Sequence, residues 1–180
     1  ADYFAEEVRR TLVGMEQFGE DGLYRGGLSV RTTLSPRLQG FARRALIEET
    51  RELQGQGLKR VYNQPVAGVP IDSQYVIFIV DTSGSMQSQN WRYAEQKMEE
   101  VLNIYPRLKG IQVMDDEGGY MFTEYRGKWI PDSPARRRAI LNRFRNWQAF
   151  SNSSPSEGII AAVRTFWTRE HPIGIYVFGD

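Results

Sequence analysis

One stretch of this 180-residue chain decides its fold, Tyr75-Val76-Ile77-Phe78-Ile79-Val80-Asp81-Thr82-Ser83-Gly84-Ser85. It begins with β-branched and aromatic residues and no charged residue interrupts them. Such a run is typical of a strand buried on both faces, as in a parallel sheet covered by helices on each side. The run ends in an aspartate and hydroxyl side chains, so the sequence predicts a buried strand followed by a polar loop.

Helices are predicted after this stretch. Apolar residues recur at helical spacing from Trp91 to Tyr105, and Pro106 ends the pattern. Ser133-Pro134 and Ser154-Pro155 are typical helix starts with proline at the first helical position, and an amphipathic stretch follows each.

Further strands alternate with these helices. Residues 111–114 and 120–122 are short strand-like runs whose spacing fits a hairpin, and residues 173–178 form a second apolar strand. The alternation predicts an α/β fold over residues 74–180, with a doubly wound (Rossmann-like), mostly parallel sheet.

The first part of the chain has a different pattern. Residues 3–15 have helical spacing, residues 28–34 alternate as a half-buried strand, and Ser35-Pro36 starts a second helix. Residues 54–73 contain several glycines and prolines and little periodicity. We therefore expect a small α+β segment over residues 1–53, then a linker, and then the α/β domain.

The composition excludes several kinds of function. Lys plus Arg number 23 and Asp plus Glu number 22, so the net charge of +1 argues against binding nucleic acid or an anionic membrane through bulk charge. The chain has no cysteine and one histidine, which excludes disulfides, zinc–thiolate sites, cysteine nucleophiles and multi-histidine metal sites. No apolar run approaches the roughly 20 residues of a membrane-spanning helix.

Oxygen-bearing side chains gather in the loops that follow or precede buried elements. Asp81, Ser83 and Ser85 alternate along one loop, Ser154 precedes a helix, and Asp180 follows the last strand. Ligands of open α/β sheets bind beyond the carboxyl ends of the strands, and Mg²⁺ prefers oxygen ligands. Hydroxyl ligands are neutral, so an ion bound mainly by them keeps part of its positive charge. We expect it to take a further carboxylate from an acidic partner.

At these residues the chain resembles von Willebrand factor type A domains. Asp81-x-Ser83-x-Ser85 after an apolar strand looks like their metal-ion-dependent adhesion motif. Ser154 stands where the family usually has threonine, and Asp180 matches the aspartate of their third loop. The resemblance covers about residues 72–180. It implies a Mg²⁺ or Mn²⁺ ion that binds a protein partner, with the two aspartates as ligands directly or through water.

The same resemblance implies an order of neighbouring strands and an incomplete domain. Residues 120–122, 111–114, 75–80 and 173–178 would be neighbours in that order. The family continues for about two more strands and a helix, so the domain is expected to be truncated. Residues 173–178 would then lie at an open sheet edge, which predicts modest stability or self-association.

Plainer interpretations of the same residues remain open. Ser83 and Ser85 could cap the following helix, and Ser154 with Glu157 has the spacing of a capping box. Asp180 could be solvated and without a role. The other two serines of the loop before residue 154, at positions 151 and 153, are interpreted as loop residues and not as ligands.

The first part of the chain carries a second resemblance. Residues 19–34 read GEDGLYRGGLSVRTTL, with Pro36 and Leu38-Gln39 after them. This pattern is similar to the segment that joins the glycosyltransferase and transpeptidase domains of class A penicillin-binding proteins, although Ser35 replaces the usual aspartate. The resemblance covers residues 1–53 and neither active site. No serine in the chain has a lysine three residues later, as the transpeptidase nucleophile motif requires.

Two functional hypotheses follow, and a fusion of unrelated pieces is a third possibility. The leading hypothesis is a non-enzymatic, metal-dependent protein-binding module with metal ligands Asp81, Ser83, Ser85, Ser154 and Asp180. The alternative is a non-catalytic fragment of a bifunctional peptidoglycan glycosyltransferase/transpeptidase. The second resemblance also implies a location in the bacterial cell envelope or periplasm.

Overall fold

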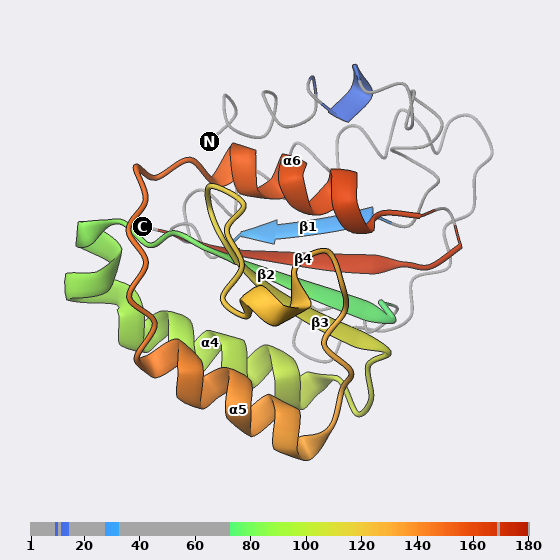
Figure 1. The fold of residues 1–180 in the computed structure, drawn as a ribbon, viewed down its shortest axis with the longest axis horizontal. Helices are drawn as coiled ribbons and strands as arrows, with labels where there is room; N and C mark the ends of the chain where they lie inside the picture. The colour runs from blue at the N-terminus through green and yellow to red at the C-terminus, as the bar shows by residue number, and fades with distance from the viewer. Residues whose placement is uncertain (1–9, 11, 15–27, 33–72, 169, 180) are drawn as a thin grey trace, which may run out of the picture.

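The computed structural model describes residues 10, 12–14, 28–32, 73–168 and 170–179, and of residues 28–32 only the backbone. Within these residues four strands form one sheet in the order β1-β4-β2-β3, and every neighbouring pair is parallel (Figure 1). The strands are β1 (Leu28–Thr32), β2 (Tyr75–Val80), β3 (Gly110–Asp115) and β4 (Ile173–Phe178). The α/β fold class predicted from the sequence is confirmed.

The helices cover both faces of this sheet. α4 (Trp91–Ile104) and α5 (Pro134–Arg145) lie on one face and α6 (Pro155–Phe166) on the other (Figure 1). Successive side chains of a strand point to opposite faces. Accordingly Phe78 packs in the core under α4 and α5, whereas Ile77 and Ile79 pack under α6. Both faces of β2 are therefore buried, as its apolar composition predicts.

The helix starts predicted at Ser133-Pro134 and Ser154-Pro155 and the stop at Pro106 are confirmed. α5 begins at Pro134, and the Ser133 side chain caps it by accepting a hydrogen bond from the Arg136 peptide N–H at 3.1 Å. α6 begins at Pro155. A short π-helical turn, η1 (Met86–Asn90), precedes α4.

The predicted strand over residues 120–122 is not formed. Tyr120 makes a single antiparallel bridge to Met114, after which the chain turns into the 3₁₀ helix η2 (Thr123–Tyr125). The cause is Gln112, a fully buried amide whose Nε2 donates to the carbonyls of Tyr125 and Lys128 at 3.0 and 2.7 Å. These bonds draw the chain across the outer edge of β3, so that a continuous ladder is replaced by isolated bridges.

The prediction that residues 173–178 lie at an open edge is wrong. β1 pairs with β4 from Leu28 opposite Ile173 to Thr32 opposite Val177, so β4 lies between β1 and β2. The physical reason is that each side of a strand offers backbone donors and acceptors, and β1 satisfies those that β2 leaves free. The implied neighbours 111–114, 75–80 and 173–178 do occur in that order.

Little of the first 72 residues is described. Arg10, Leu12 and Val13 are helical, and Leu12 is buried in the same hydrophobic cluster as the inner side chains of α6. The other residues of the predicted helices over 3–15 and after Ser35, and the linker over 54–73, lie outside the described residues. The division into three parts stays a prediction. No described helix has both the length and the apolar character needed to cross a membrane.

Candidate functional site

Asp81 lies at the carboxyl end of β2, where the sheet edge meets several loops. Its peptide N–H donates to the Phe178 carbonyl at 2.8 Å, which holds it beside the end of β4. The side chain is almost fully buried. Oδ1 accepts the Ser83 peptide N–H at 2.8 Å, and Oδ2 accepts the Ser153 hydroxyl at 2.7 Å. Asp81 therefore organises its own loop and holds the loop before α6.

The two serines of the motif converge as the sequence predicts. The Oγ atoms of Ser83 and Ser85 lie 3.2 Å apart, and Ser85 is exposed. Ser85 precedes η1 without a side-chain capping bond. In an octahedral Mg²⁺ site with ligands at about 2.0–2.1 Å, adjacent ligand oxygens lie roughly 3 Å apart. The spacing of the two hydroxyls thus fits adjacent positions in one coordination sphere.

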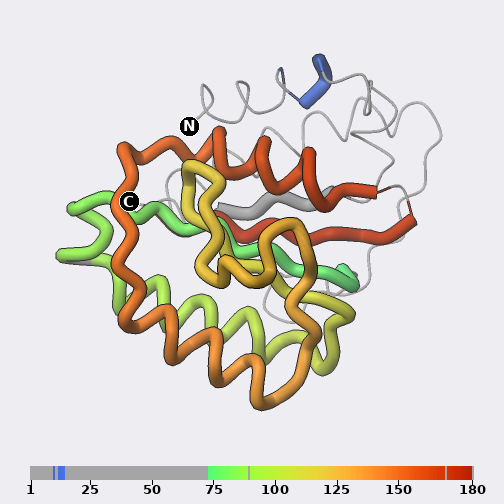
Figure 2. The backbone as a smooth tube through the Cα atoms, in the orientation of Figure 1, coloured from blue at the N-terminus to red at the C-terminus, as the bar shows by residue number. Residues whose placement is uncertain are grey.

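Asp116 connects this loop to the start of α6. Its carboxylate is fully buried; Oδ1 accepts the Thr82 peptide N–H at 3.2 Å, and Oδ2 accepts the Ser154 peptide N–H at 2.7 Å. Its carbonyl accepts the Gly158 N–H at 2.7 Å, in the first turn of α6. Figure 2 shows the loops after β2 and β3 and the loop before α6 together at one end of the sheet.

The capping box predicted for Ser154 and Glu157 is not formed. Ser154 is the N-cap residue of α6, but its side chain makes no capping bond. Its peptide N–H is bound by Asp116, which places the residue beside the site and leaves its role as a metal ligand a prediction. Asp180 lies outside the described residues, so its predicted role also stays a prediction.

Negative charge at the site has no basic partner among the residues that the structure describes. Neither Asp81 nor Asp116 takes part in an ion pair there, and both carboxylates are buried. Hydroxyl and peptide donors supply their hydrogen bonds. A donor set of one carboxylate and two hydroxyls fits a hard cation, which would also neutralise part of this charge. The described chain contains no cluster of three or more His, Cys, Asp or Glu residues of metal-binding kind.

Sequence reasoning gave Asp116 no role in this site, and it interpreted Ser151 and Ser153 as loop residues without finding their contacts. Asp116 comes directly after β3, just as Asp81 comes after β2, so the strand-end rule would have found it. Ser151 Oγ accepts the Thr82 peptide N–H at 3.2 Å, and the Ser153 hydroxyl binds Asp81. Ser153 has a positive φ of 60°, a conformation that is uncommon for serine and that these contacts hold in place.

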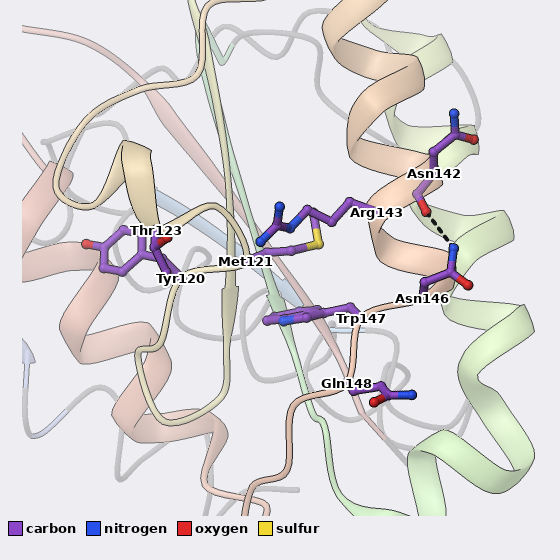
Figure 3. Close-up of a pocket in the computed structure, with 8 residues that line it drawn as sticks. All are labelled: Tyr120, Met121, Thr123, Asn142, Arg143, Asn146, Trp147 and Gln148. Carbon is purple, nitrogen blue, oxygen red and sulfur yellow. Dashed lines mark hydrogen bonds between the residues drawn. The ribbon is translucent and has the colours of Figure 1, made fainter.

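A separate pocket lies between the end of α5 and the chain after Gly119. Its volume is ≈ 470 Å³, and the Arg143 side chain extends from α5 along Met121, with the Trp147 ring on the other side of Met121 (Figure 3). The Arg143 guanidinium also lies 4.9 Å from the centre of the Phe122 ring. None of the predicted metal ligands lines this pocket, so it is distinct from the site at Asp81.

Part of the chain is similar in sequence to penicillin-binding protein 1A. It is 36% identical over 73 residues to that protein from Rickettsia prowazekii (strain Madrid E), a match that covers 41% of this chain and 9% of the relative. It is 35% identical over 116 residues to the protein of the same name from Rickettsia typhi (strain ATCC VR-144 / Wilmington), covering 64% of this chain and 13% of the relative. The chain therefore spans a small part of the length of these relatives.

The matches confirm the resemblance to penicillin-binding proteins over part of the chain. The resemblance to von Willebrand factor type A domains is not among them and stays a prediction. No protein-family model matches the chain. No solved structure matches it either.

Proposed function

We propose that the chain is a non-catalytic part of a bifunctional peptidoglycan synthase of the penicillin-binding protein type, located in the bacterial cell envelope. The similarity to penicillin-binding protein 1A carries this proposal. The chain itself lacks a Ser-x-x-Lys nucleophile motif. The enzymatic activity would then belong to other parts of the same protein.

Two measurements test this first function. Sequencing the gene on both sides of this stretch should find a Ser-x-x-Lys motif in the same reading frame, and a complete frame without one would contradict the proposal. Fluorescent penicillin should leave the purified chain unlabelled. Covalent labelling of any serine in it would show that the chain is catalytic after all.

A second function is favoured by one specific observation, the 3.2 Å between the Ser83 and Ser85 hydroxyl oxygens beside the buried Asp81 carboxylate. The α/β part would hold Mg²⁺ or Mn²⁺ through these three side chains. Ser154 and Asp180 are the further candidate ligands. The ion would bind an acidic side chain of a protein partner, because its protein ligands leave it with positive charge to spare. This function is compatible with the first.

Cation binding can be measured directly. Mn²⁺ or Mg²⁺ added to the full chain should give a calorimetric binding signal and raise the melting temperature, since an ion that binds only the folded state adds about 2.7 kcal/mol at a hundredfold excess over Kd. Asp81→Ala should abolish both effects. Glu99→Ala removes an exposed carboxylate from α4 and is the matched control. An unchanged response in Asp81→Ala would rule the site out.

A further inference from the structure

Phe150 is a large apolar side chain that the fold leaves in solvent. Its exposed fraction is 78%, against 51% for Tyr93, the other exposed large apolar side chain of the described residues. Single exposed apolar residues are common and need no explanation by themselves. The difference here lies in how the loop around Phe150 is held.

Each of the other residues from 149 to 154 is hydrogen-bonded to η1 or to a neighbouring loop. The Ala149 carbonyl accepts from Gln87 Nε2, and Ser151 Oγ accepts from the Thr82 peptide N–H. The Asn152 peptide N–H donates to Glu117 Oε1 at 2.9 Å. The next two residues bind Asp81 and Asp116, as described above. The loop is therefore fixed on both sides of Phe150, so little backbone order would remain to be gained when the ring meets a partner.

The position of Phe150 relates it to the candidate cation site. It lies three residues before Ser153, whose hydroxyl donates to Asp81. It also follows Ala149, and the Gln87 side-chain amide donates both to the Ala149 carbonyl and to the Thr82 carbonyl. Three residues span at most about 10 Å of extended chain. In Figure 2 this loop lies beside the loop that follows β2. An exposed aromatic residue and the candidate cation site thus lie in neighbouring loops at the same end of the sheet.

We propose that Phe150 is the apolar anchor of a protein-docking surface whose second element is the cation at Asp81, Ser83 and Ser85. This inference rests on the second proposed function. The partner segment carries an acidic side chain for the cation and an apolar side chain within one to three residues of it, to cover Phe150. The positive charge of the cation favours the acidic side chain of the partner, and the Phe150 ring favours the apolar side chain near it. Buried aromatic anchors carry a large share of the energy of protein interfaces.

The experiment uses the full chain as bait for a random heptapeptide display library, with binding in Mg²⁺ and elution with EDTA. The wild-type chain should enrich peptides in which Asp or Glu stands within three residues of Leu, Ile, Phe, Met or Trp. Phe150→Ser should still enrich acidic peptides, without the apolar neighbour, and should bind the wild-type selected peptides roughly tenfold more weakly. Tyr93→Ser is the matched control and should behave as the wild type does.

The outcomes separate this inference from the function on which it depends. Enrichment of the same apolar neighbours on Phe150→Ser would overturn the role of Phe150 and leave the cation site intact. Mn²⁺ binding by calorimetry without any Mg²⁺-dependent peptide would overturn the docking surface as a whole. Absence of Mn²⁺ binding by the wild-type chain would overturn the proposed cation function itself. If the chain self-associates in Mg²⁺ and Phe150→Ser abolishes this, the proposal of a foreign partner is overturned, because the partner is then a second copy of this chain.

Discussion

Asp116 shows how one buried carboxylate can hold two loops that are far apart in the sequence. It binds the peptide N–H groups of Thr82 and Ser154, which belong to the loop after β2 and to the start of α6. If the carboxylate were removed, the Ser154 N–H would lose its acceptor, whereas the Thr82 N–H would keep its bond to Ser151 Oγ. An unsatisfied buried N–H costs about 1–3 kcal/mol. Removal of a buried charge without a basic partner offsets part of that cost.

Asp116→Ala is therefore expected to lower the free energy of unfolding by about 1–3 kcal/mol, because the Ser154 N–H loses its acceptor and the Thr82 N–H keeps only Ser151 Oγ. Asp116→Asn retains one carbonyl acceptor and should lose less. Urea unfolding followed by circular dichroism measures both. Glu99→Ala, which removes an exposed carboxylate, should change the free energy by no more than about 0.5 kcal/mol. Equal stability of Asp116→Ala and the wild type would show that the two hydrogen bonds are not significant.

Replacing Gly158 by alanine should change stability in two opposite ways, one through helix propensity and one through packing. A Cβ at this position would lie 2.9 Å from the Asp115 carbonyl oxygen and 2.9 Å from Asp116 Cα. Propensity alone predicts that Gly158→Ala stabilises α6 by about 1 kcal/mol, whereas overpacking against backbone costs about 1–3 kcal/mol. We expect a net loss, seen as a lower melting temperature. Gly84→Ala, where no atom lies within 4 Å of the added Cβ, should show no such loss.

Arg137 of α5 forms a partly buried ion pair with Asp132, which lies just before α5, and hydrogen bonds link both residues to the chain after α4. Arg137 Nε and Nη2 bind the two carboxylate oxygens of Asp132 at 2.7 and 2.6 Å, and Nη1 donates to the Tyr105 carbonyl at 2.9 Å. Burial alone would raise the pKa of Asp132, but hydrogen bonds from Arg137 and the Leu108 peptide N–H outweigh it and lower the pKa. The charged form of Asp132 is therefore the stabilising one.

The pH dependence of this pair follows from the lowered pKa. Because the folded pKa lies below the unfolded value of about 3.9, the pair stabilises the fold above that pH, and the contribution is lost as the pH falls through the folded pKa. Asp132→Asn should be less stable than the wild type at pH 7. The difference between the two should shrink as the pH falls below about 4. Urea midpoints at several pH values measure it, and a constant difference down to pH 2 would contradict the assignment.

The elements that the sequence predicts best are those whose pattern reflects burial alone. β2, β4 and α4 have apolar runs or stripes long enough to identify them, and the Ser-Pro pairs mark the starts of α5 and α6. Residues 120–122 have the composition of a strand but do not form one, because the Gln112 side chain binds the carbonyls of the turn that follows them. That contact joins residues 13 and 16 positions apart, so no local sequence pattern predicts it. The convergence of Ser83 and Ser85 was predictable because it depends on two residues in one loop. The hydrogen bond from Ser153 to Asp81 was not, because it joins loops separated by 72 residues.

At the scale of the whole molecule, the pairing of β1 with β4 decides whether the sheet has an open apolar edge. Consecutive residues of a strand direct their backbone N–H groups to opposite sides, so of Val30 and Arg31 one donates toward β4. Replacing both by proline removes that donor whichever residue supplies it. The variant Val30→Pro/Arg31→Pro should detach β1 and expose the edge of β4, whereas Val30→Ala/Arg31→Ala retains both N–H groups.

The proline variant should therefore show a lower urea midpoint and a sedimentation coefficient that rises with protein concentration, because an uncovered strand edge pairs with another chain. The alanine variant should sediment as the wild type does. If the proline variant stays monomeric and equally stable, β1 contributes no protection to the edge of β4 and the proposed role of this pairing is wrong.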